Sequence, residues 1–259
     1  MTVTVATSCT ACGSCLVTCP AGALRAAPRR PAVVDDRCTD CLACLEVCPV
    51  DAIGPRPNEA IHPIEMESYR ILYGRVNLDA WPPGQRDVVA RMIHATADES
   101  FATTIRIGGA AVAAAVTAVR SGAAVVCDSN MVVAGIPAVA RATCFLDQVP
   151  AAASGDTRSA AAIRAGAERH PVGAVWVIGN APTALRQLLR LHAGGLVAPA
   201  AVIGVPVGYV GAAEAKAALW DSRLQAVTIT NTGERGGSPA AAAALNAINR
   251  LARPRGGPR

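Results

Sequence analysis

The N-terminal part of the chain contains cysteines at a spacing that could bind iron–sulfur clusters. Eight of the ten cysteines belong to two copies of the pattern C-x2-C-x2-C-x3-C-P, which are separated by a constant offset of 29 residues. The first copy ends at Pro20 and the second at Pro49. In such a run, three closely spaced thiolates bind three corners of one [4Fe–4S] cubane, and the fourth cysteine reaches the other cluster. The spacing predicts two such clusters rather than zinc, whose sites usually use two separated cysteine pairs.

The crossed arrangement assigns one cysteine of each copy to the cluster of the other copy. The first cluster then has Cys9, Cys12, Cys15 and Cys48 as ligands, and the second has Cys38, Cys41, Cys44 and Cys19. The stretch from Thr2 to Gly54 resembles the bacterial two-cluster ferredoxins, which implies an electron-transfer module. The proline-broken segment from Gly54 to Pro57 predicts a short stiff linker. We therefore expect a ferredoxin-like domain at residues 1–56.

The composition fits one small domain joined to a larger one. Of the 259 residues, 52% are hydrophobic and 17% are charged, and the formal net charge is +5. Lys216 is the only lysine, so the positive charges are almost all arginine forks, which suit carboxylates and phosphates. The mild charge favours an anionic ligand, and the lack of a basic helix argues against nucleic acid. We expect the larger domain at residues 57–252 and a disordered basic tail at 253–259.

The ends and the apolar runs of the sequence predict a soluble cytoplasmic protein with no membrane contact. The first eight residues lack the charged and apolar regions of a signal peptide. The charge-free apolar run from Ile107 to Val119 is too short and too rich in glycine and alanine to span a bilayer. In a reducing compartment, ten cysteines favour metal binding over disulfides.

From about Asn58 onward, apolar runs alternate with segments of helical periodicity. Buried strands are predicted at Ala123–Cys127, Val172–Ile178, Ala200–Val205 and Gln225–Thr230. Helices are expected at Asp87–Ala95 with Asp87 as N-cap, in the second half of Phe101–Arg120, and at Arg158–Glu168, Pro182–Leu191, Val210–Leu219 and Pro239–Leu251. Apolar strands separated by helices indicate a parallel sheet covered on both faces. The predicted fold class is α/β, with a doubly wound and mostly parallel sheet behind a small α+β ferredoxin domain.

The loops that follow the predicted strands are rich in small polar residues. In a doubly wound fold, ligands bind at the carboxyl ends of the strands, where helix N-termini favour anions. The loops are Cys127–Asn130, Gly179–Thr183, Gly204–Gly208 and Asn231–Ser238. Each alone is ordinary turn chemistry, but four at one sheet edge predict a pocket. Because no GxGxxG or P-loop spacing occurs, no nucleotide cofactor is expected.

Catalytic candidates are few in the larger domain. Cys127 and Cys144 lie in apolar contexts that are typical of buried, inert thiols. The histidines at element boundaries are His62, His170 and His192. His94 lies on an amphipathic helix and could be either an acid/base group or a hydrogen-bonded core histidine. The residues alone indicate a pocket for an anionic small molecule with at most one good acid or base.

Six separated stretches of the larger domain resemble the precorrin-8X methylmutase family (precorrin isomerase, cobalt-precorrin-8 methylmutase) of cobalamin biosynthesis. They occur in family order and cover nearly all of Ile64 to Leu251. The stretches are Ala90–Asp98, Ser121–Ile136, Thr157–Ala162, Val177–Leu185, Gly204–Lys216 and Gly236–Ala247. The resemblance implies an isomerase that moves a methyl group from ring carbon 11 to ring carbon 12 of precorrin-8X or cobalt-precorrin-8, giving hydrogenobyrinic or cobyrinic acid. Such a redox-neutral [1,5]-sigmatropic shift needs no nucleophile.

The resemblance also implies roles for individual residues and a state of assembly. The catalytic histidine of the family falls at His94, which would protonate or hydrogen-bond the ring-nitrogen side of the macrocycle. Arg158 would bind a substrate carboxylate, and Ser68 matches a family serine near the active site. Weaker substrate-binding candidates are Thr96, Asn180 and Ser238. The family is typically a homodimer with pockets near the subunit interface.

Two departures from the family pattern concern the rim of the expected pocket. Asp156 stands where the family usually has asparagine before T-R-S. Glu234 stands where a basic residue often precedes the glycine-rich turn, although Arg235 remains. Both changes alter the charge that a substrate carboxylate would meet. They leave open whether the substrate is metal-free or cobalt-bound.

The ferredoxin-like module has no role in a reaction that moves no net electrons. An alternative function is therefore an iron–sulfur electron-transfer protein that binds a corrinoid and reduces its cobalt. A third hypothesis is that the clusters are structural, or that they sense oxygen or iron. The sequence leaves the redox partner and the cluster potentials open.

Overall fold

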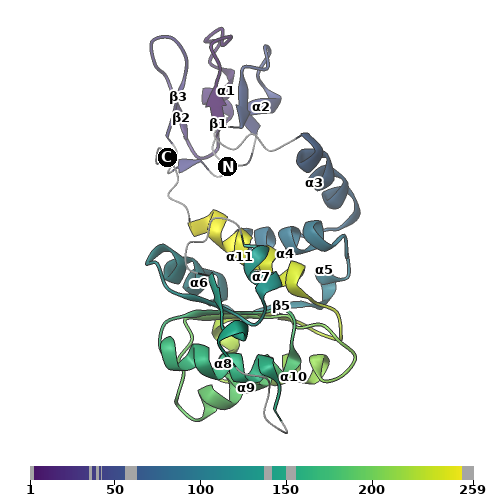
Figure 1. The fold of residues 1–259 in the computed structure, drawn as a ribbon. Helices are drawn as coiled ribbons and strands as arrows, with labels where there is room; N and C mark the ends of the chain where they lie inside the picture. Colours follow the sequence, from purple (N-terminus) through teal and green to yellow (C-terminus); the bar gives the residue numbers. More distant parts are fainter. Residues whose placement is uncertain are drawn as a thin grey trace. The chain divides into compact units, whose positions relative to one another are not determined.

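The structure is a computed structural model and describes residues 3–34, 37, 38, 41, 43–55, 63–136, 142–149 and 156–252 (Figure 1). The chain divides into a smaller unit that extends to Met66 and a larger unit that starts at Glu67. In the part of the chain that the structure describes, no helix is both long enough and apolar enough to cross a membrane.

The smaller unit repeats a strand–helix–strand arrangement. The first copy consists of β1 (Val3–Val5), α1 (Ser14–Thr18) and β2 (Leu24–Arg25), and the second consists of β3 (Ala32–Val33), α2 (Ala43–Glu46) and β4 (Ile53–Pro55). The strands pair across the copies, β1 with β4 and β2 with β3, both antiparallel. Each copy therefore completes the small sheet of the other, and their apolar residues form one core with Cys15 and Cys44.

The end of this unit differs from the sequence-based expectation. β4 extends to Pro55, which lies opposite Val3 in the antiparallel pair. The prediction that Gly54 and Pro55 begin a linker is therefore wrong, because both belong to a strand. Arg56 and Pro57 lie outside the described residues, as do His62 and the predicted tail at 253–259.

The larger unit contains a six-stranded sheet with the order β5-β10-β9-β8-β6-β7. Its strands are β5 (Ile105–Ile107), β6 (Val125–Cys127), β7 (Ala142–Cys144), β8 (Val175–Ile178), β9 (Ala201–Gly204) and β10 (Thr228–Asn231). Only β5 is antiparallel to its neighbour, and all the other neighbouring pairs are parallel. The predicted α/β fold with a mostly parallel sheet is confirmed.

Helices cover both faces of the sheet, as Figure 1 shows. One face is covered by α6 (Ala111–Arg120) and α11 (Ser238–Ala252), and α4 (Pro83–Thr96) packs on α11 in the same core. The other face is covered by α8 (Arg158–Arg169), α9 (Pro182–Ala193) and α10 (Ala212–Trp220). Along β8, Val175 and Val177 belong to the first core, whereas Trp176 and Ile178 belong to the second. Because both faces of a central strand are buried, its sequence is continuously apolar.

The remaining elements are short or peripheral. They are α3 (Pro63–Arg75), α5 (Phe101–Thr104), α7 (Asn130–Ala134), and 3-10 helices at Leu146–Gln148 and Gln225–Val227. The segment from Gln225 to Val227 was expected to begin a strand, but it is helical and β10 starts only at Thr228. Asp87 was expected to cap α4, but the helix begins at Pro83, so Asp87 lies inside it. Proline suits the first turn of a helix, because its missing N–H needs no partner there.

Candidate active site and iron–sulfur site

His94 lies in the last turn of α4 and contacts two adjacent side chains of α3. The Oγ atom of Ser68 lies 2.9 Å from Nδ1 of His94. The ring of Tyr69 stacks on the imidazole, with the ring centroids 4.6 Å apart and the planes inclined by 6°. The phenol oxygen of Tyr69 accepts a hydrogen bond of 3.4 Å from Nη1 of Arg91. The imidazole is thus held at one ring nitrogen and across one face, which fixes the direction of Nε2.

The helix that carries His94 ends at Thr96. The Thr96 hydroxyl donates to the carbonyl of Met92 at 2.8 Å and accepts from the backbone N–H of Asp98 at 3.3 Å. Ala97 adopts the left-handed conformation, with φ of 52°, which ends the helix. Thr96 therefore has a structural role at the end of α4, and a contact between its hydroxyl and a substrate stays a prediction.

The carboxyl ends of β6 and β8 are joined by the buried carboxylate of Asp128. It accepts hydrogen bonds from three successive backbone N–H groups, those of Gly179, Asn180 and Ala181, at 2.7–3.0 Å. These groups directly precede α9, so the carboxylate satisfies donors at the start of that helix. Burial raises the pKa of Asp128, and the three N–H donors oppose that effect. Asn180 thus contacts Asp128 through its backbone, while the residue itself is exposed.

Ser238 lies at the start of α11, beside the carboxyl end of β6. Its buried Oγ lies 3.3 Å from Oγ of Ser129, and Ser129 in turn accepts from the N–H of Val132 as the N-cap of α7. The preceding glycine, Gly237, donates from its backbone N–H to the carbonyl of Val205 after β9. The loops after β6, β8, β9 and β10 are therefore gathered at one edge of the sheet.

Arg158 is the first residue of α8 and is exposed. Its Nη2 donates to the carbonyl of Leu146 at 3.0 Å. The preceding residue, Thr157, caps the helix and donates from its hydroxyl to Oγ1 of Thr183 in the first turn of α9 at 2.8 Å. The start of α8 is thereby fixed to the start of α9, close in sequence to Asn180. Asp156, the departure noted above, forms an ion pair with Arg164 of the same segment.

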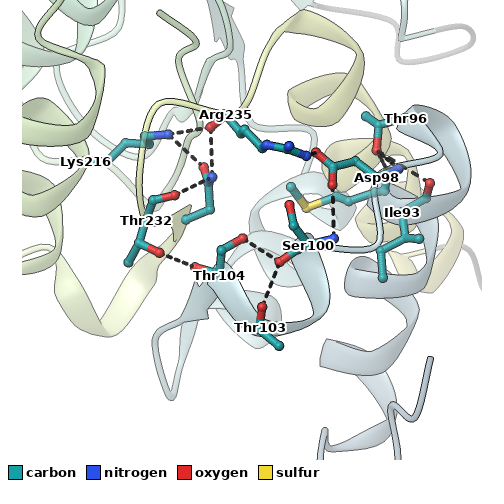
Figure 2. A network of polar contacts seen from close by, with 11 residues as sticks. Ile93, Thr96, Asp98, Ser100, Thr103, Thr104, Lys216, Thr232 and Arg235 are labelled. Carbon is teal, nitrogen blue, oxygen red and sulfur yellow. Dashed lines mark hydrogen bonds and ion pairs between the residues drawn. The ribbon is translucent and has the colours of Figure 1, made fainter. Parts of the chain in front are cut away.

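A polar network links the end of the His94 helix to the loop before Ser238 (Figure 2). Arg235 donates from Nη1 to Oδ2 of Asp98 at 2.6 Å, and Asp98 accepts the N–H of Ser100 at 3.0 Å. Burial raises the pKa of Asp98, but the hydrogen bonds from Ser100 and Arg235 outweigh burial, so the net pKa is lowered. The same loop is joined to the end of α5 through the N–H of Thr232, which donates to the carbonyl of Thr104.

The cysteines of the smaller unit line two cavities. One cavity is lined by Cys9, Cys12, Cys15 and Cys48. The other is lined by Cys19, Cys38, Cys41 and Cys44. Each cavity thus takes three cysteines from one copy of the repeat and the last cysteine from the other copy.

The last cysteine of each copy is held by equivalent hydrogen bonds. The N–H of Ala23 donates to Sγ of Cys19 at 3.3 Å, and the N–H of Ala52 donates to Sγ of Cys48 at 3.1 Å. All ten cysteines are free thiols. Among the described side chains, no three of His, Cys, Asp or Glu are grouped as ligands of a single metal ion. Four thiols spaced around a cavity, with N–H donors directed at sulfur, fit a cubane cluster better than one tetrahedral ion.

The other thiols of the larger unit are buried or half-buried, and its other described histidines lie at the ends of helices. Cys127 is 1% exposed, and burial raises the pKa of its thiol. Burial also raises the pKa of Cys144, the residue opposite it on β7. His170 follows α8, and His192 contacts the carbonyl of Val197 at 3.0 Å through Nδ1.

Tyr69 and Lys216 were not predicted as parts of a site, and Asp128 was predicted only as a member of the loop Cys127–Asn130. The position of Asp128 could have indicated its role, because a carboxylate directly after a buried strand needs hydrogen-bond donors at the sheet edge. The position of Lys216 could have done so as well, since the only lysine of the sequence lies among the apolar residues of its helix. Nothing in the sequence signals that Tyr69 stacks on His94, because the contact depends on how α3 packs.

The fold and these side chains define an α/β domain in which the imidazole of His94 is held by two neighbouring side chains, in the same chain as a cysteine-rich ferredoxin-like unit. Comparison with known proteins agrees with both parts. The family profile described as Precorrin-8X methylmutase matches residues 63–251, and the profile described as 4Fe-4S dicluster domain matches residues 8–52. The chain belongs to the precorrin-8X methylmutase family, whose members are isomerases, and it carries an iron–sulfur domain in front of the methylmutase domain.

Individual relatives support the same assignment. The Precorrin-8X methylmutase of Pseudomonas aeruginosa is 41% identical over 203 residues, which cover 74% of this chain and 95% of that protein. The Cobalt-precorrin-8 methylmutase of Synechocystis is 35% identical over 211 residues, covering 74% and 96%. The crystal structure of the precorrin-8X methylmutase from Thermus thermophilus is 36% identical and superimposes with a TM-score of 0.67 over 73% of this chain and 95% of that one.

Proposed function

We propose that this protein catalyses the migration of a methyl group from ring carbon 11 to ring carbon 12 of precorrin-8X or cobalt-precorrin-8, with His94 as the catalytic residue. The observation that carries this proposal is the fixed imidazole of His94, held by Ser68 and Tyr69 in a chain of the methylmutase family. One carbon–carbon bond breaks and another forms, so the products balance without a cofactor or an oxidant.

The surroundings of His94 suit a residue that gives and regains one proton. A serine hydroxyl can either donate to Nδ1 or accept from it, so Ser68 can remain bonded to the neutral and to the protonated imidazole. We assign the transferred proton to Nε2, which would protonate or hydrogen-bond a ring nitrogen and so ease the migration. A fixed ring contributes to the rate because the reacting groups need no further orientation.

The substrate would be held mainly through its carboxylates. Arg158 stands at the start of α8, where a guanidinium and a helix N-terminus both favour an anion. Asn180 and Ser238 lie at the same sheet edge, and Thr96 lies on the His94 helix. We propose these as substrate contacts, in a cytoplasmic homodimer whose pockets lie near the subunit interface. The names of the relatives include both metal-free and cobalt-bound substrates, so both are candidates.

The assay for this proposal follows the absorption change of the corrin chromophore as the methyl group moves. Precorrin-8X and cobalt-precorrin-8 are each incubated with the full-length protein and with the His94→Ala variant. We expect turnover of at least one substrate by the wild type and a loss of at least a hundredfold in kcat for the variant. Full turnover by His94→Ala would overturn the catalytic role of His94 but leave the methylmutase activity standing.

For the smaller unit, we propose a domain of residues 1–56 with two [4Fe–4S] clusters, followed by the methylmutase domain at 57–252. The two cysteine-lined cavities support one cluster with Cys9, Cys12, Cys15 and Cys48, and another with Cys19, Cys38, Cys41 and Cys44. When bound, such clusters supply one-electron transfer. The protein would supply the thiolate ligands and the N–H groups that donate to sulfur. The number of these hydrogen bonds and the burial of each cluster would set its reduction potential.

A second candidate function is the reduction of cobalt in a bound corrinoid, with a separate redox protein as electron donor. The observation that favours it is the dicluster domain itself, because the methyl shift moves no net electrons. In the test, the reduced full-length protein is mixed with a cobalt(II) corrinoid and the absorption of cobalt(I) is followed. A cobalt(II) spectrum that stays unchanged would exclude this function. A methylmutase rate that differs between the oxidised and reduced protein would instead indicate a regulatory module.

A further inference from the structure

Lys216 is a buried cation at a place where the fold does not require one. The residue lies on α10 and is 1% exposed. Its helix buries small or apolar residues beside it, Ala212, Ala215 and Leu219. An apolar side chain of the same length would fill this position without the cost of removing an ammonium group from water. The presence of lysine therefore needs an explanation from what its Nζ contacts.

The ammonium group binds the loop that follows β10. Nζ of Lys216 donates to Oδ1 of Asn231 at 3.2 Å and to the carbonyl oxygen of Arg235 at 2.5 Å. The same carbonyl accepts a second bond of 2.8 Å from Nδ2 of Asn231. Asn231 is itself 1% exposed, so this is a buried polar centre in which the carbonyl of Arg235 is held by two donors.

The side chain of Arg235 continues from this fixed carbonyl to the helix of His94. Its guanidinium donates to Asp98, which stands directly after α4, and Figure 2 shows Lys216, Arg235 and Asp98 in one continuous network. On the other side of the same carbonyl, the chain passes through two glycines into Ser238 at the start of α11. One buried ammonium thus fixes a loop that connects to both the His94 helix and the start of α11.

The charges around Lys216 compensate its burial poorly. Both of its acceptors are neutral oxygens, and the carboxylate that acts on it is that of Glu234, an exposed residue of the same loop. Burial lowers the pKa of Lys216 to about 8, and Glu234 opposes that effect only in part. Glu214 lies on the same helix but is exposed. A cation kept at such a cost in the interior is characteristic of functional regions.

We propose that Lys216 is a positioning residue for the methylmutase site, which acts by fixing the loop Asn231–Arg235 so that Arg235 holds Asp98 at the end of the His94 helix. The inference rests on the proposed function of His94 for its effect on catalysis, but the network can be measured without turnover. Lys216 touches no reacting atom in this proposal and acts only through Arg235 and Asp98.

The first experiment uses the fact that the chain has one lysine. The full-length protein is labelled with ε-13C-lysine, and the single NMR signal is titrated between pH 6 and 11. We expect a midpoint near 8. A midpoint near the ordinary value of about 10.5 would mean that the acceptors around Nζ offset the burial in full. A signal with the narrow linewidth of a freely rotating side chain would overturn the proposal, because the ammonium would then be in water and not in the network.

The second experiment compares Lys216→Met with the control Glu214→Gln, which removes a charge from the exposed side of the same helix. We expect Lys216→Met to lower kcat at least tenfold at pH 7 while the thermal unfolding midpoint is unchanged or higher, since misplaced groups lower the rate strongly. The wild-type kcat should also decline above pH 8, and the variant should lack this decline. Wild-type kcat and pH profile in Lys216→Met would overturn the proposal.

A double-mutant cycle and amide hydrogen exchange separate this inference from the assignment of the reaction. If Lys216 acts through Arg235, the effects of Lys216→Met and Arg235→Met on kcat should not add. In Lys216→Met, the amides of residues 98–104 and 232–237 should exchange faster, and those of α8 should not. If the wild type shows no methylmutase activity, the proposed function fails. The exchange result would still show whether Lys216 holds the loop after β10 and the end of α4. Unchanged exchange at residues 98–104 would overturn the inference even in an active enzyme.

Discussion

The Oγ atom of Ser68 lies 2.9 Å from Nδ1 of His94, although the two residues belong to different helices. The resemblance to the methylmutase family had implied only that Ser68 lies near the active site. The structure places the hydroxyl of Ser68 more specifically, beside Nδ1 of His94, the residue that we propose transfers the proton. A hydrogen bond at Nδ1 fixes the orientation of an imidazole, so Ser68 is better placed to act on His94 than on a distant part of the substrate.

Replacing Ser68 by alanine tests this role. We expect Ser68→Ala to lower kcat about tenfold with little change in KM, because one hydrogen bond to the acid/base group is worth about 1 kcal/mol and its loss misorients the ring. Ser68→Thr keeps a hydroxyl and should retain most of the rate. Steady-state kinetics with the preferred corrin substrate measure both constants. A raised KM with unchanged kcat would instead assign Ser68 to substrate binding.

The stacking of Tyr69 on His94 gives a second prediction. Replacement by leucine removes the aromatic face, which lies 4.6 Å from the imidazole, and aromatic pairs of this kind contribute about 1 kcal/mol. We expect Tyr69→Leu to lower kcat about fivefold. Tyr69→Phe keeps the ring and loses only the contact with Arg91, so it serves as the matched control. Equal rates for the leucine and phenylalanine variants would show that the stack has no part in catalysis.

The sequence predicted the parts of this molecule in which a local pattern determines the structure. The cysteine repeat predicted the duplicated unit, and the apolar runs predicted the central strands, because a strand buried on both faces has no polar positions. The short strands β5 and β7 were not predicted. β5 has only three residues, with Arg106 in the middle, and three residues are too few to show the alternation of apolar and polar side chains that indicates a strand. The helix α4 begins at Pro83, four residues before the predicted start at Asp87, because a proline fits the first turn as well as an N-cap residue fits the position before it.

The contacts of the candidate site could not be predicted in the same way. His94 and Ser68 were both named from family motifs, but their hydrogen bond depends on how α3 packs against α4. The network through Lys216 likewise joins three segments, α10, the loop after β10 and the end of α4. Such contacts are decided by tertiary packing, which sequence periodicity describes only as the direction of an apolar face.

The crossed grouping of cysteines predicts how single variants affect the clusters. Cys19 lines the cavity of the second copy, and Cys48 lines the cavity of the first. Cys48→Ser should therefore perturb the same cluster as Cys15→Ser, and Cys19→Ser the same cluster as Cys44→Ser. Electron paramagnetic resonance of the reduced protein distinguishes the two clusters. If Cys48→Ser instead altered the same signal as Cys44→Ser, the crossed assignment would be wrong.

The hydrogen bonds of Asp128 predict that this residue stabilises the carboxyl edge of the sheet. Its carboxylate is the acceptor for three backbone N–H groups before α9, and a buried donor left without a partner costs about 1–3 kcal/mol. We expect Asp128→Ala to lower the free energy of unfolding by about 3 kcal/mol. Asp128→Asn retains one oxygen acceptor and should lose less. Urea denaturation followed by circular dichroism measures the difference, and an unchanged midpoint in Asp128→Ala would contradict this account.

The buried ammonium of Lys216 predicts how stability depends on pH. Its pKa in the folded protein is lowered from 10.5 to about 8, so between these values the unfolded chain binds more protons than the folded chain does. Stability therefore rises with pH across this window, and the contribution is lost as pH falls through 8. After allowance for residual hydration, we expect the free energy of unfolding to rise by about 2 kcal/mol from pH 8 to pH 10, relative to Lys216→Met. Urea denaturation of both proteins at each pH gives this difference, and the comparison cancels the groups that the two chains share. A difference that does not change with pH would mean that the lysine has the same pKa in the folded and unfolded states, and the burial of its ammonium would then carry no net electrostatic cost.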